Sequence, residues 1–138
     1  MRVGIVSDTH GLLRPELLRA LEGVEHILHA GDVGSEEILD ELAAIAPLTA
    51  VWGNTDGWGV RGRLPEVAEV ELEGKRIIIL HGMQLGSPTA RSVAALHGTA
   101  DLVVFGHSHQ PEIKAVRNVL TVNPGSAGPR RFGDPVSA

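Results

Sequence analysis

Two histidines separated by one residue follow directly after an apolar segment in the second half of the chain. Residues 102–105 are apolar and partly β-branched, which indicates a short buried strand, and Gly106 then precedes His107, Ser108 and His109. In extended backbone, side chains at positions i and i+2 lie on one side of the chain. Two imidazoles held together beside the end of a buried strand are suited to bind a metal ion.

Four other apolar segments end in polar residues of the same kind. They end at residues 7, 30, 52 and 80, and each is followed within a few residues by His, Asp or Asn. Because the carboxyl ends of parallel strands meet at one edge of an open α/β sheet, we expect these side chains to converge. The candidate metal ligands are Asp8, His10, Asp32, Asn54, His81, His107 and His109.

These seven ligands are more than one tetrahedral ion accepts, and two ions sharing a bridging carboxylate fit the number. Four imidazoles with three carboxylate or amide groups suit Mn²⁺, Fe, Ni²⁺, Co²⁺ or Zn²⁺ better than an all-oxygen Mg²⁺ site, and we expect Mn²⁺. Two ions about 3.5–4 Å apart can lower the pKa of a bridging water and hold both oxygens of an in-line displacement. Phosphate esters need this help most, because their anionic oxygens repel a nucleophile.

The elements that must position these ligands alternate between strands and helices in the first half of the chain. The apolar patterns predict strands at 2–7, 26–30 and 48–52, with helices at 14–22 and 35–46 between them. This order indicates a parallel sheet with right-handed crossovers, and therefore an α/β fold.

The second half is less regular. The predicted elements are a loop at 57–65, a hairpin of strands 67–73 and 76–80, a helix at 88–96, a strand at 102–105, and a second hairpin of strands 113–117 and 119–122.

Composition excludes several classes of protein. A chain of 138 residues fits one domain, and its net charge of −5 argues against a general nucleic-acid-binding surface. Cysteine is absent, which excludes disulfides, thiolate metal sites and a cysteine nucleophile. The N-terminus enters a strand directly, without a basic leader or a long apolar stretch, so we expect a cytoplasmic protein with no membrane contact. Composition does not decide whether the protein forms a homo-oligomer.

Taken together, the motifs resemble the calcineurin-like metallophosphoesterase superfamily. Its pattern D-x-H, G-D, G-N-x-D, H-G and G-H-x-H occurs in order between residues 8 and 109. Asn-Pro-Gly-Ser at 123–126 is shared with the small bacterial and archaeal phosphodiesterases of that superfamily. The resemblance implies a four-layer α/β/β/α sandwich with two mixed β-sheets. It also implies one or two more strands than residues 1–138 supply, so either the chain is truncated or a sheet has an open edge.

The resemblance further implies a dinuclear centre that hydrolyses small phosphate esters, above all phosphodiesters, by a metal-bridging hydroxide. The implied first ion has the ligands Asp8, His10, Asp32 and His109. The implied second ion has the ligands Asp32, Asn54, His81 and His107, with Asp32 bridging. Asp32, Asn54, His81 and His107 are also the residues to which we assign catalytic roles.

Thr55 departs from the family pattern. Many members have His at this position, proposed to protonate the leaving group, and a Thr hydroxyl cannot act as a general acid near neutral pH. The small phosphodiesterases often lack this His as well, so we expect activity that is slow on esters with poor leaving groups. The residues expected near the substrate are Asn54, Thr55, Ser108, Asn123 and Ser126.

Two other functions stay open: a phosphomonoesterase, including a phosphoprotein phosphatase, and a catalytically silent binding scaffold like the retromer subunit of this fold. The complete ligand set argues against a scaffold, because such a cluster is costly without a cation. Among the remaining polar residues, we expect His29 to be buried and hydrogen-bonded, and Asp56 either to support a ligand histidine or to form a turn. The arginines that could bind phosphate, but that we expect to be solvated, are Arg61, Arg63, Arg130 and Arg131.

Overall fold

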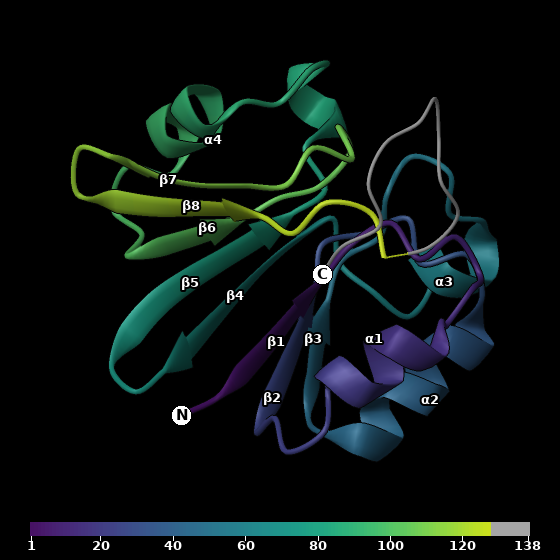
Figure 1. The fold of residues 1–138 in the computed structure, drawn as a ribbon. Coiled ribbons are helices and arrows are strands. Elements are labelled where there is room, and N and C mark those ends of the chain that lie inside the picture. Colours follow the sequence, from purple (N-terminus) through teal and green to yellow (C-terminus); the bar gives the residue numbers. More distant parts are fainter. Residues whose placement is uncertain (128–138) are drawn as a thin grey trace.

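Two β-sheets face each other between outer helices in the computed structural model, which describes residues 1–127 (Figure 1). The first sheet has the order β1-β2-β3 and is parallel throughout. Its strands are β1 (Val3–Val6), β2 (His26–His29) and β3 (Leu48–Ala50). The crossovers are made by α1 (Pro15–Ala20) and α2 (Glu36–Ile45), as the alternation of elements predicts.

The second sheet has five strands in the order β4-β5-β6-β8-β7. The two hairpins pair antiparallel, and β6 pairs parallel with both β5 and β8, so this sheet is mixed. Helix α4 (Ala90–Leu96) makes the crossover between β5 and β6. The strands are β4 (Val67–Leu72), β5 (Lys75–Leu80), β6 (Leu102–Val104), β7 (Glu112–Val116) and β8 (Val119–Asn123).

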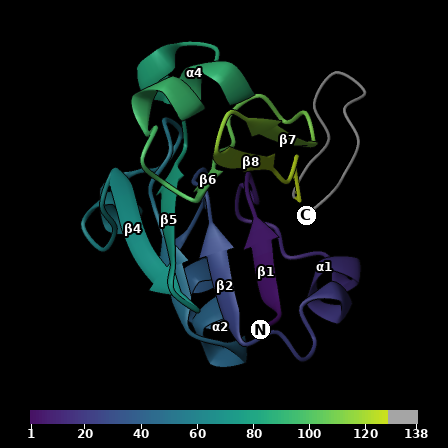
Figure 2. The same ribbon diagram turned by 90° about the vertical axis from the view of Figure 1, so that its left-hand side faces the viewer.

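Three apolar clusters lie between the four layers of the predicted sandwich. Figure 2 shows the arrangement of the strands and helices that form these layers. On β2, Ile27 packs toward α1 and α2, whereas Leu28 packs into the layer between the sheets. On β5, Ile79 faces that same middle layer and Ile78 packs toward α4. Strands buried on both faces explain the unbroken apolar runs, and each fully buried Leu or Ile contributes about 2 kcal/mol. The four-layer fold is confirmed, but the first sheet is parallel rather than mixed among the described residues.

Two local predictions differ from the structure. The segment predicted as a loop contains a short helix, α3 (Trp58–Arg61), which its glycines concealed. The helix predicted from residue 88 begins at Ala90, where Thr89 and Ser92 form a capping box. A short 3₁₀ helix, η1 (Met83–Leu85), lies between β5 and α4. No helix within residues 1–127 is long and apolar enough to cross a membrane.

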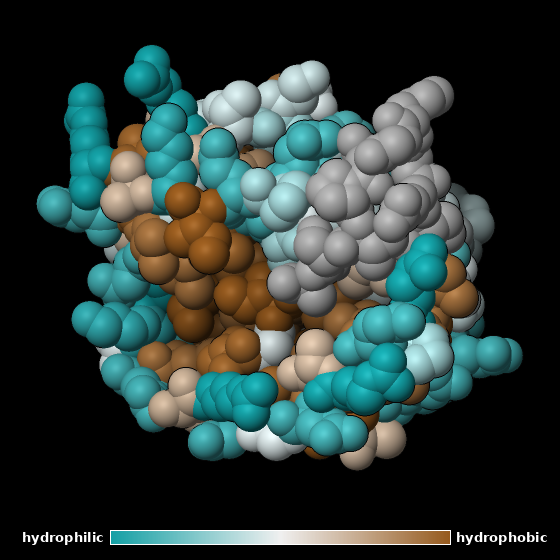
Figure 3. All heavy atoms as spheres, viewed as in Figure 1, coloured by the Kyte–Doolittle hydropathy of each residue, from teal (hydrophilic) through white to brown (hydrophobic). Residues whose placement is uncertain are grey.

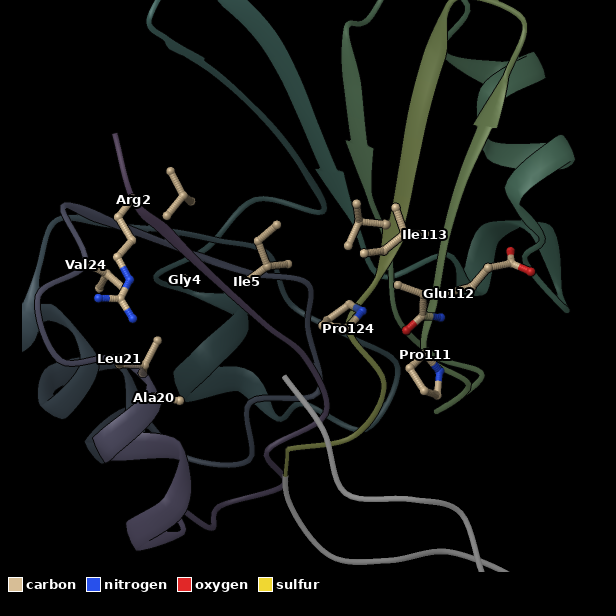
Figure 4. A pocket seen from close by; sticks show the side chains of 13 residues that line it. Arg2, Gly4, Ile5, Ala20, Leu21, Val24, Pro111, Glu112, Ile113 and Pro124 are labelled. Carbon is tan, nitrogen blue, oxygen red and sulfur yellow. The ribbon is translucent and has the colours of Figure 1, made fainter.

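The middle layer opens as an apolar groove where β1 edges the first sheet and β7 edges the second. The groove has a volume of about 600 Å³, and its walls include Ile5 and Leu21 on one side and Ile113 and Pro124 on the other (Figure 4). Figure 3 shows apolar side chains gathered in this hollow. None of the seven candidate metal ligands lines the groove, so it is separate from the predicted metal site, although Asn123 lies in its wall.

Candidate metal centre

The loops that follow β1, β2, β3, β5 and β6 meet at one end of the two sheets. Backbone hydrogen bonds join them: the N–H of Asp8 donates to the Gly31 carbonyl at 3.0 Å, and that of Gly106 donates to the His81 carbonyl at 3.1 Å. All seven sequence-predicted ligands lie in these loops, each directly or shortly after its strand. The structure therefore brings together the residues that the strand-end pattern singled out.

Two buried carboxylates form the middle of the cluster. Asp8 Oδ1 lies 3.3 Å from His109 Nε2, 3.8 Å from His10 Nε2 and 3.9 Å from His81 Nε2. Asp32 Oδ2 lies 3.2 Å from His81 Nε2 and 3.7 Å from His10 Nε2. Both carboxylates are less than 5% exposed, so the imidazoles surround carboxylate groups that are shielded from water.

His107 and Asn54 extend the cluster from His81 toward the surface. His107 Nδ1 lies 3.2 Å from His81 Nε2 and 3.1 Å from Asn54 Oδ1. The His81 and His107 rings meet edge to face with centroids 5.0 Å apart. Asn54 is exposed and His107 is half-buried, so this side of the cluster faces solvent.

The donor set fits divalent cations. Two groups of three have their ligand atoms within 4.8 Å of one another: Asp8, His10 and His109, and Asp8, Asp32 and His81. Among the described residues, neither Asp8 Oδ1 nor His10 Nε2 has a hydrogen-bond partner, although both atoms are buried. Buried polar atoms are costly when unsatisfied, and a bound cation would satisfy these. The groups share Asp8, whereas the family resemblance implies Asp32 as the bridge.

Electrostatics within the cluster favour the charged form of Asp32. Burial raises the pKa of Asp32, but hydrogen bonds from His81 and Thr55 outweigh it and hold this pKa below its usual range. Burial lowers the pKa of His81, but its hydrogen bond and proximity to Asp32 outweigh burial and raise the pKa. His81 Nδ1 donates to the Ala30 carbonyl at 2.8 Å, so Nε2 is the ring atom that faces the carboxylates.

Five of the seven candidate ligands have left-handed backbone. Their φ angles are 58° at Asp8, 47° at His10, 54° at Asp32, 72° at His107 and 60° at His109. This region costs an L-residue roughly 1–2 kcal/mol and is uncommon outside glycine. Such strain gathers at sites where geometry is needed for function, and here it turns each side chain inward directly after its strand.

Two glycines allow the ligand loops to approach one another closely. A Cβ at Gly53 would lie 2.1 Å from Asp32 Oδ1, and one at Gly106 would lie 2.0 Å from Ser7 Oγ. Ser7 in turn donates to Asp8 Oδ2 at 2.5 Å, which fixes the carboxylate that Asp8 presents to the histidines. Any side chain at these glycines would push the ligand loops apart.

Asp56 joins two ligand loops rather than supporting a histidine. Its carboxylate accepts the N–H groups of Val33, Gly34 and Gly53 at 3.1, 2.9 and 2.9 Å. It therefore fixes the segment after Asp32 against the segment that leads to Asn54. Of the two roles open from the sequence, the structure supports a turn residue that also spans loops.

The residues predicted near the substrate fall into two groups. Thr55 and Ser108 are exposed, and the Thr55 N–H donates to Asp32 Oδ1 at 3.0 Å. Asn123 and Ser126 are buried: Asn123 Nδ2 donates to Ser108 Oγ at 2.9 Å, and Ser126 Oγ donates to the Asp8 carbonyl at 3.3 Å. Asn123 and Ser126 therefore stabilise the ligand loops from the buried side of the cluster.

His29 is buried and hydrogen-bonded, as predicted. Its Nδ1 accepts from the Gly31 N–H at 3.1 Å, so Nε2 carries the proton and donates to Thr9 Oγ1 at 3.0 Å. Thr9 Oγ1 donates onward to the Val33 carbonyl at 2.7 Å. Burial lowers the pKa of His29 to about 4, so this ring is neutral near pH 7 and has no access to solvent.

Arg61 differs from the prediction that the arginines are solvated. It is half-buried, and its guanidinium donates to the carbonyls of Asn54 and Asp56. Arg63 pairs with Asp40 on the surface, in line with the prediction. Arg130 and Arg131 lie outside the described residues. Nothing in the local sequence marks Arg61, because its partners are carbonyl groups that every residue carries.

The chain belongs to the calcineurin-like phosphoesterase superfamily, whose domain it matches over residues 1–138. It is 37% identical over 143 residues to a probable metallophosphoesterase from Methanothermobacter thermautotrophicus, covering 98% of this chain and 82% of that one. It is also 30% identical over 142 residues to phosphodiesterase MJ0936 from Methanocaldococcus jannaschii, covering 91% of this chain and 83% of the other.

Solved structures share the fold. A novel archaeal phosphodiesterase has a TM-score of 0.72 at 27% identity, with 92% of this chain and 85% of that chain covered. Vps29 from Entamoeba histolytica complexed with Zn²⁺ has a TM-score of 0.80 at 25% identity, with 92% and 75% covered. The similar proteins thus include enzymes named for phosphodiester hydrolysis and a protein named for vacuolar sorting.

Proposed function

We propose that this protein is a metal-dependent phosphodiesterase that works with two divalent ions, Mn²⁺ above all. The observation that carries the proposal is the convergence of seven metal-capable side chains, with Asp8 Oδ1 and His10 Nε2 buried and without hydrogen-bond partners in the described chain. A bound cation would satisfy both atoms. Relatives named as phosphodiesterases support the choice of reaction.

In this proposal, Asp8, His10 and His109 hold one ion, and Asn54, His81 and His107 hold the other, with Asp32 between them. Two bound ions would lower the pKa of a bound water. They would also place positive charge beside the phosphate oxygens. The protein contributes geometry: the left-handed backbone at Asp8 and Asp32 and the Ala30 carbonyl on His81 aim the ligand atoms before any ion arrives.

The substrate in this proposal is a small phosphodiester that approaches from the exposed side of the cluster. Asn54, Thr55 and Ser108 are the exposed residues on that side. Asn123 and Ser126 stay in the proposal as residues that support the substrate site, because both hydrogen-bond to ligand-bearing loops. Thr55 offers no acid group, which favours substrates whose leaving group departs without a proton.

Metal analysis followed by turnover assays tests the proposal. We expect two bound ions per chain and Mn²⁺-dependent hydrolysis of an aryl phosphodiester at a higher rate than its monoester. Replacing Asp32 with Asn should weaken both ions, because its carboxylate stands between them. Asp40→Asn removes a surface carboxylate of the same kind and should behave like the wild type. One bound ion that Asp32→Asn does not affect would contradict the dinuclear proposal.

A binding scaffold is the second candidate, because Vps29 structures share this fold closely. The same experiment separates the two. Mn²⁺ binding with no turnover of any diester or monoester would favour the scaffold, and faster turnover of the monoester would favour a phosphomonoesterase.

A further inference from the structure

The loop after β3 carries Asn54 to the rim of the cluster and lies outside both sheets. Asn54 and Thr55 are exposed, and Asn54 Oδ1 lies 3.1 Å from His107 Nδ1. These two atoms must stay close together if the two residues are to share an ion. On the inner side, the Asp56 carboxylate and the Thr55 N–H tie this loop to the Asp32 loop. These contacts do not fix the main chain of Asn54 on the outer, solvent-facing side of the loop.

Arg61 supplies a restraint on that outer side from α3. Its Nε donates to the Asp56 carbonyl at 2.6 Å, and its Nη2 donates to the Asn54 carbonyl at 3.2 Å. The guanidinium carbon lies 4.2 Å from the centroid of the Trp52 ring. One planar group thus stacks on the residue at the start of the loop and bonds two carbonyls farther along it.

The contacts argue against a direct role of Arg61 in binding phosphate. Two of its donor atoms are used by main-chain carbonyls, and one face of the guanidinium covers Trp52. Arg63 gives a matched contrast two residues later. Its side chain bonds Asp40 at 2.8 Å and lies 3.7 Å from Glu36, both on α2, and within residues 1–127 it forms no hydrogen bond or ion pair with the Asn54 loop.

We propose that Arg61 is a positioning residue that sets the affinity of the metal site formed by Asn54, His81 and His107. It acts by fixing the Asn54 main chain, so that the amide oxygen stays beside His107. Asp8, His10 and His109 lie on other loops, so this restraint reaches their site only indirectly, through Asp32, and should affect its affinity far less. The inference rests on the proposed dinuclear centre.

Mn²⁺ titration of the full chain by calorimetry, resolved into two affinities, tests this proposal. Arg61→Gln removes the charge and the fork of donors, and Arg61→Lys keeps the charge but cannot bond both carbonyls. We expect each variant to lose about tenfold or more in affinity for one ion, with the other within about twofold of the wild type. Arg63→Gln should titrate like the wild type.

A second measurement needs no metal. Amide exchange in the metal-free protein should be about tenfold faster at Gly53 and Thr55 in Arg61→Lys than in the wild type, and unchanged in Arg63→Gln. If Arg61→Gln does not fold, Arg61→Lys decides the question.

An equal loss of affinity for both ions would overturn the role of Arg61. Mn²⁺ affinities and amide exchange rates in Arg61→Lys that match those of the wild type would overturn it as well. Wild-type protein that binds two Mn²⁺ ions but hydrolyses no ester would contradict only the phosphodiesterase proposal. The two proposals therefore fail separately.

Discussion

Thr55 stands at the rim of the cluster, and its chemistry limits the leaving group. Its N–H holds Asp32, and its exposed hydroxyl cannot donate a proton as an acid near pH 7. We therefore predict that the hydrolysis rate falls steeply as the pKa of the leaving group rises. Thr55→His should flatten this dependence and raise the rate on alkyl diesters by about tenfold or more.

The measurement is a series of diesters of graded leaving-group pKa, assayed on wild type and Thr55→His. His81→Ala serves as the contrast, because it damages a metal site that all esters use and should lower every rate alike. Equal slopes in wild type and Thr55→His would mean that another group supplies the proton or that chemistry does not limit turnover. His29 is not that group, since it is fully buried and neutral.

His29 should make the stability of the protein depend on pH. Its pKa is about 4 in the folded protein and 6.5 as a free side chain, with burial as the main cause. Below pH 6.5 the unfolded chain therefore binds a proton that the folded chain does not. Stability should fall as pH drops from 6.5 to about 4, by about 1.4 kcal/mol per pH unit at full slope and on the order of 3 kcal/mol in all.

His29→Asn isolates this effect, because its Oδ1 can still accept the Gly31 N–H. In chelator, where metal binding cannot contribute, urea unfolding at several pH values should give a shallower fall for His29→Asn than for the wild type. The variant is expected to be less stable near pH 7, through lost packing. Parallel stability curves for the two proteins between pH 4 and 6.5 would contradict the assignment.

Sequence predicts the residues whose signal is local. His107 and His109 are marked by their own spacing, and Asp8 and Asp32 by their position after an apolar run. Arg61 and Ser7 act through main-chain carbonyls and a neighbouring carboxylate, and no side-chain pattern records such contacts. The left-handed backbone at five ligands is equally hidden, because those residue types favour ordinary regions elsewhere.

At the scale of elements, the close approach of loops depends on Gly53. A methyl group there would lie 2.1 Å from Asp32 Oδ1 and 2.4 Å from the Asp32 nitrogen. We predict that Gly53→Ala moves the Asp32 and Asn54 loops apart, costs roughly 1–3 kcal/mol of stability and weakens Mn²⁺ binding by about tenfold or more.

Gly57→Ala is the matched control, because no atom of residues 1–127 outside the adjacent residues lies within 4 Å of its added Cβ, and its φ is −83°. Both variants are measured by thermal melting and Mn²⁺ titration. Similar affinities in Gly53→Ala and Gly57→Ala would show that the loops adjust to the extra methyl group without disturbing the ligands.

Helices and strands can be predicted from the sequence where the apolar pattern is long or ends at a residue that terminates the element, such as Gly or Pro. The strand–helix alternation of the first half has both, and β1, β2 and β3 with α1 and α2 follow it within a few residues. Helix α3 spans four residues, too few for a helical period to show, and Gly57, Gly59 and Gly62 argue for a loop. Packing of Val60 in the core and the hydrogen bonds of Arg61 to the preceding loop stabilise this turn instead.

At the scale of the whole molecule, the two sheets bring five loops together at one end. The free-energy cost of burying the polar side chains on these loops depends on whether a cation is bound. Asp8 and Asp32 are buried within 4 Å of one or more histidines. Without a cation, Asp8 Oδ1 and His10 Nε2 stay unsatisfied among the described residues. Metal-free protein should therefore be less stable than metal-bound protein, since a ligand that binds only the folded state stabilises it by mass action.

We expect each Mn²⁺ ion at 100 times its dissociation constant to add about 2.7 kcal/mol. For a chain of this size that raises Tm by roughly 10 °C. Calorimetric or fluorescence melts in chelator and in graded Mn²⁺ give the shift, with Asp40→Asn as a control that should follow the wild type. Asp8→Asn removes a carboxylate that both three-ligand groups share, and its shift should be much smaller. A wild-type Tm that is the same in chelator and in millimolar Mn²⁺ would mean that the histidines are structural, because no ion of useful affinity could bind the folded state without stabilising it.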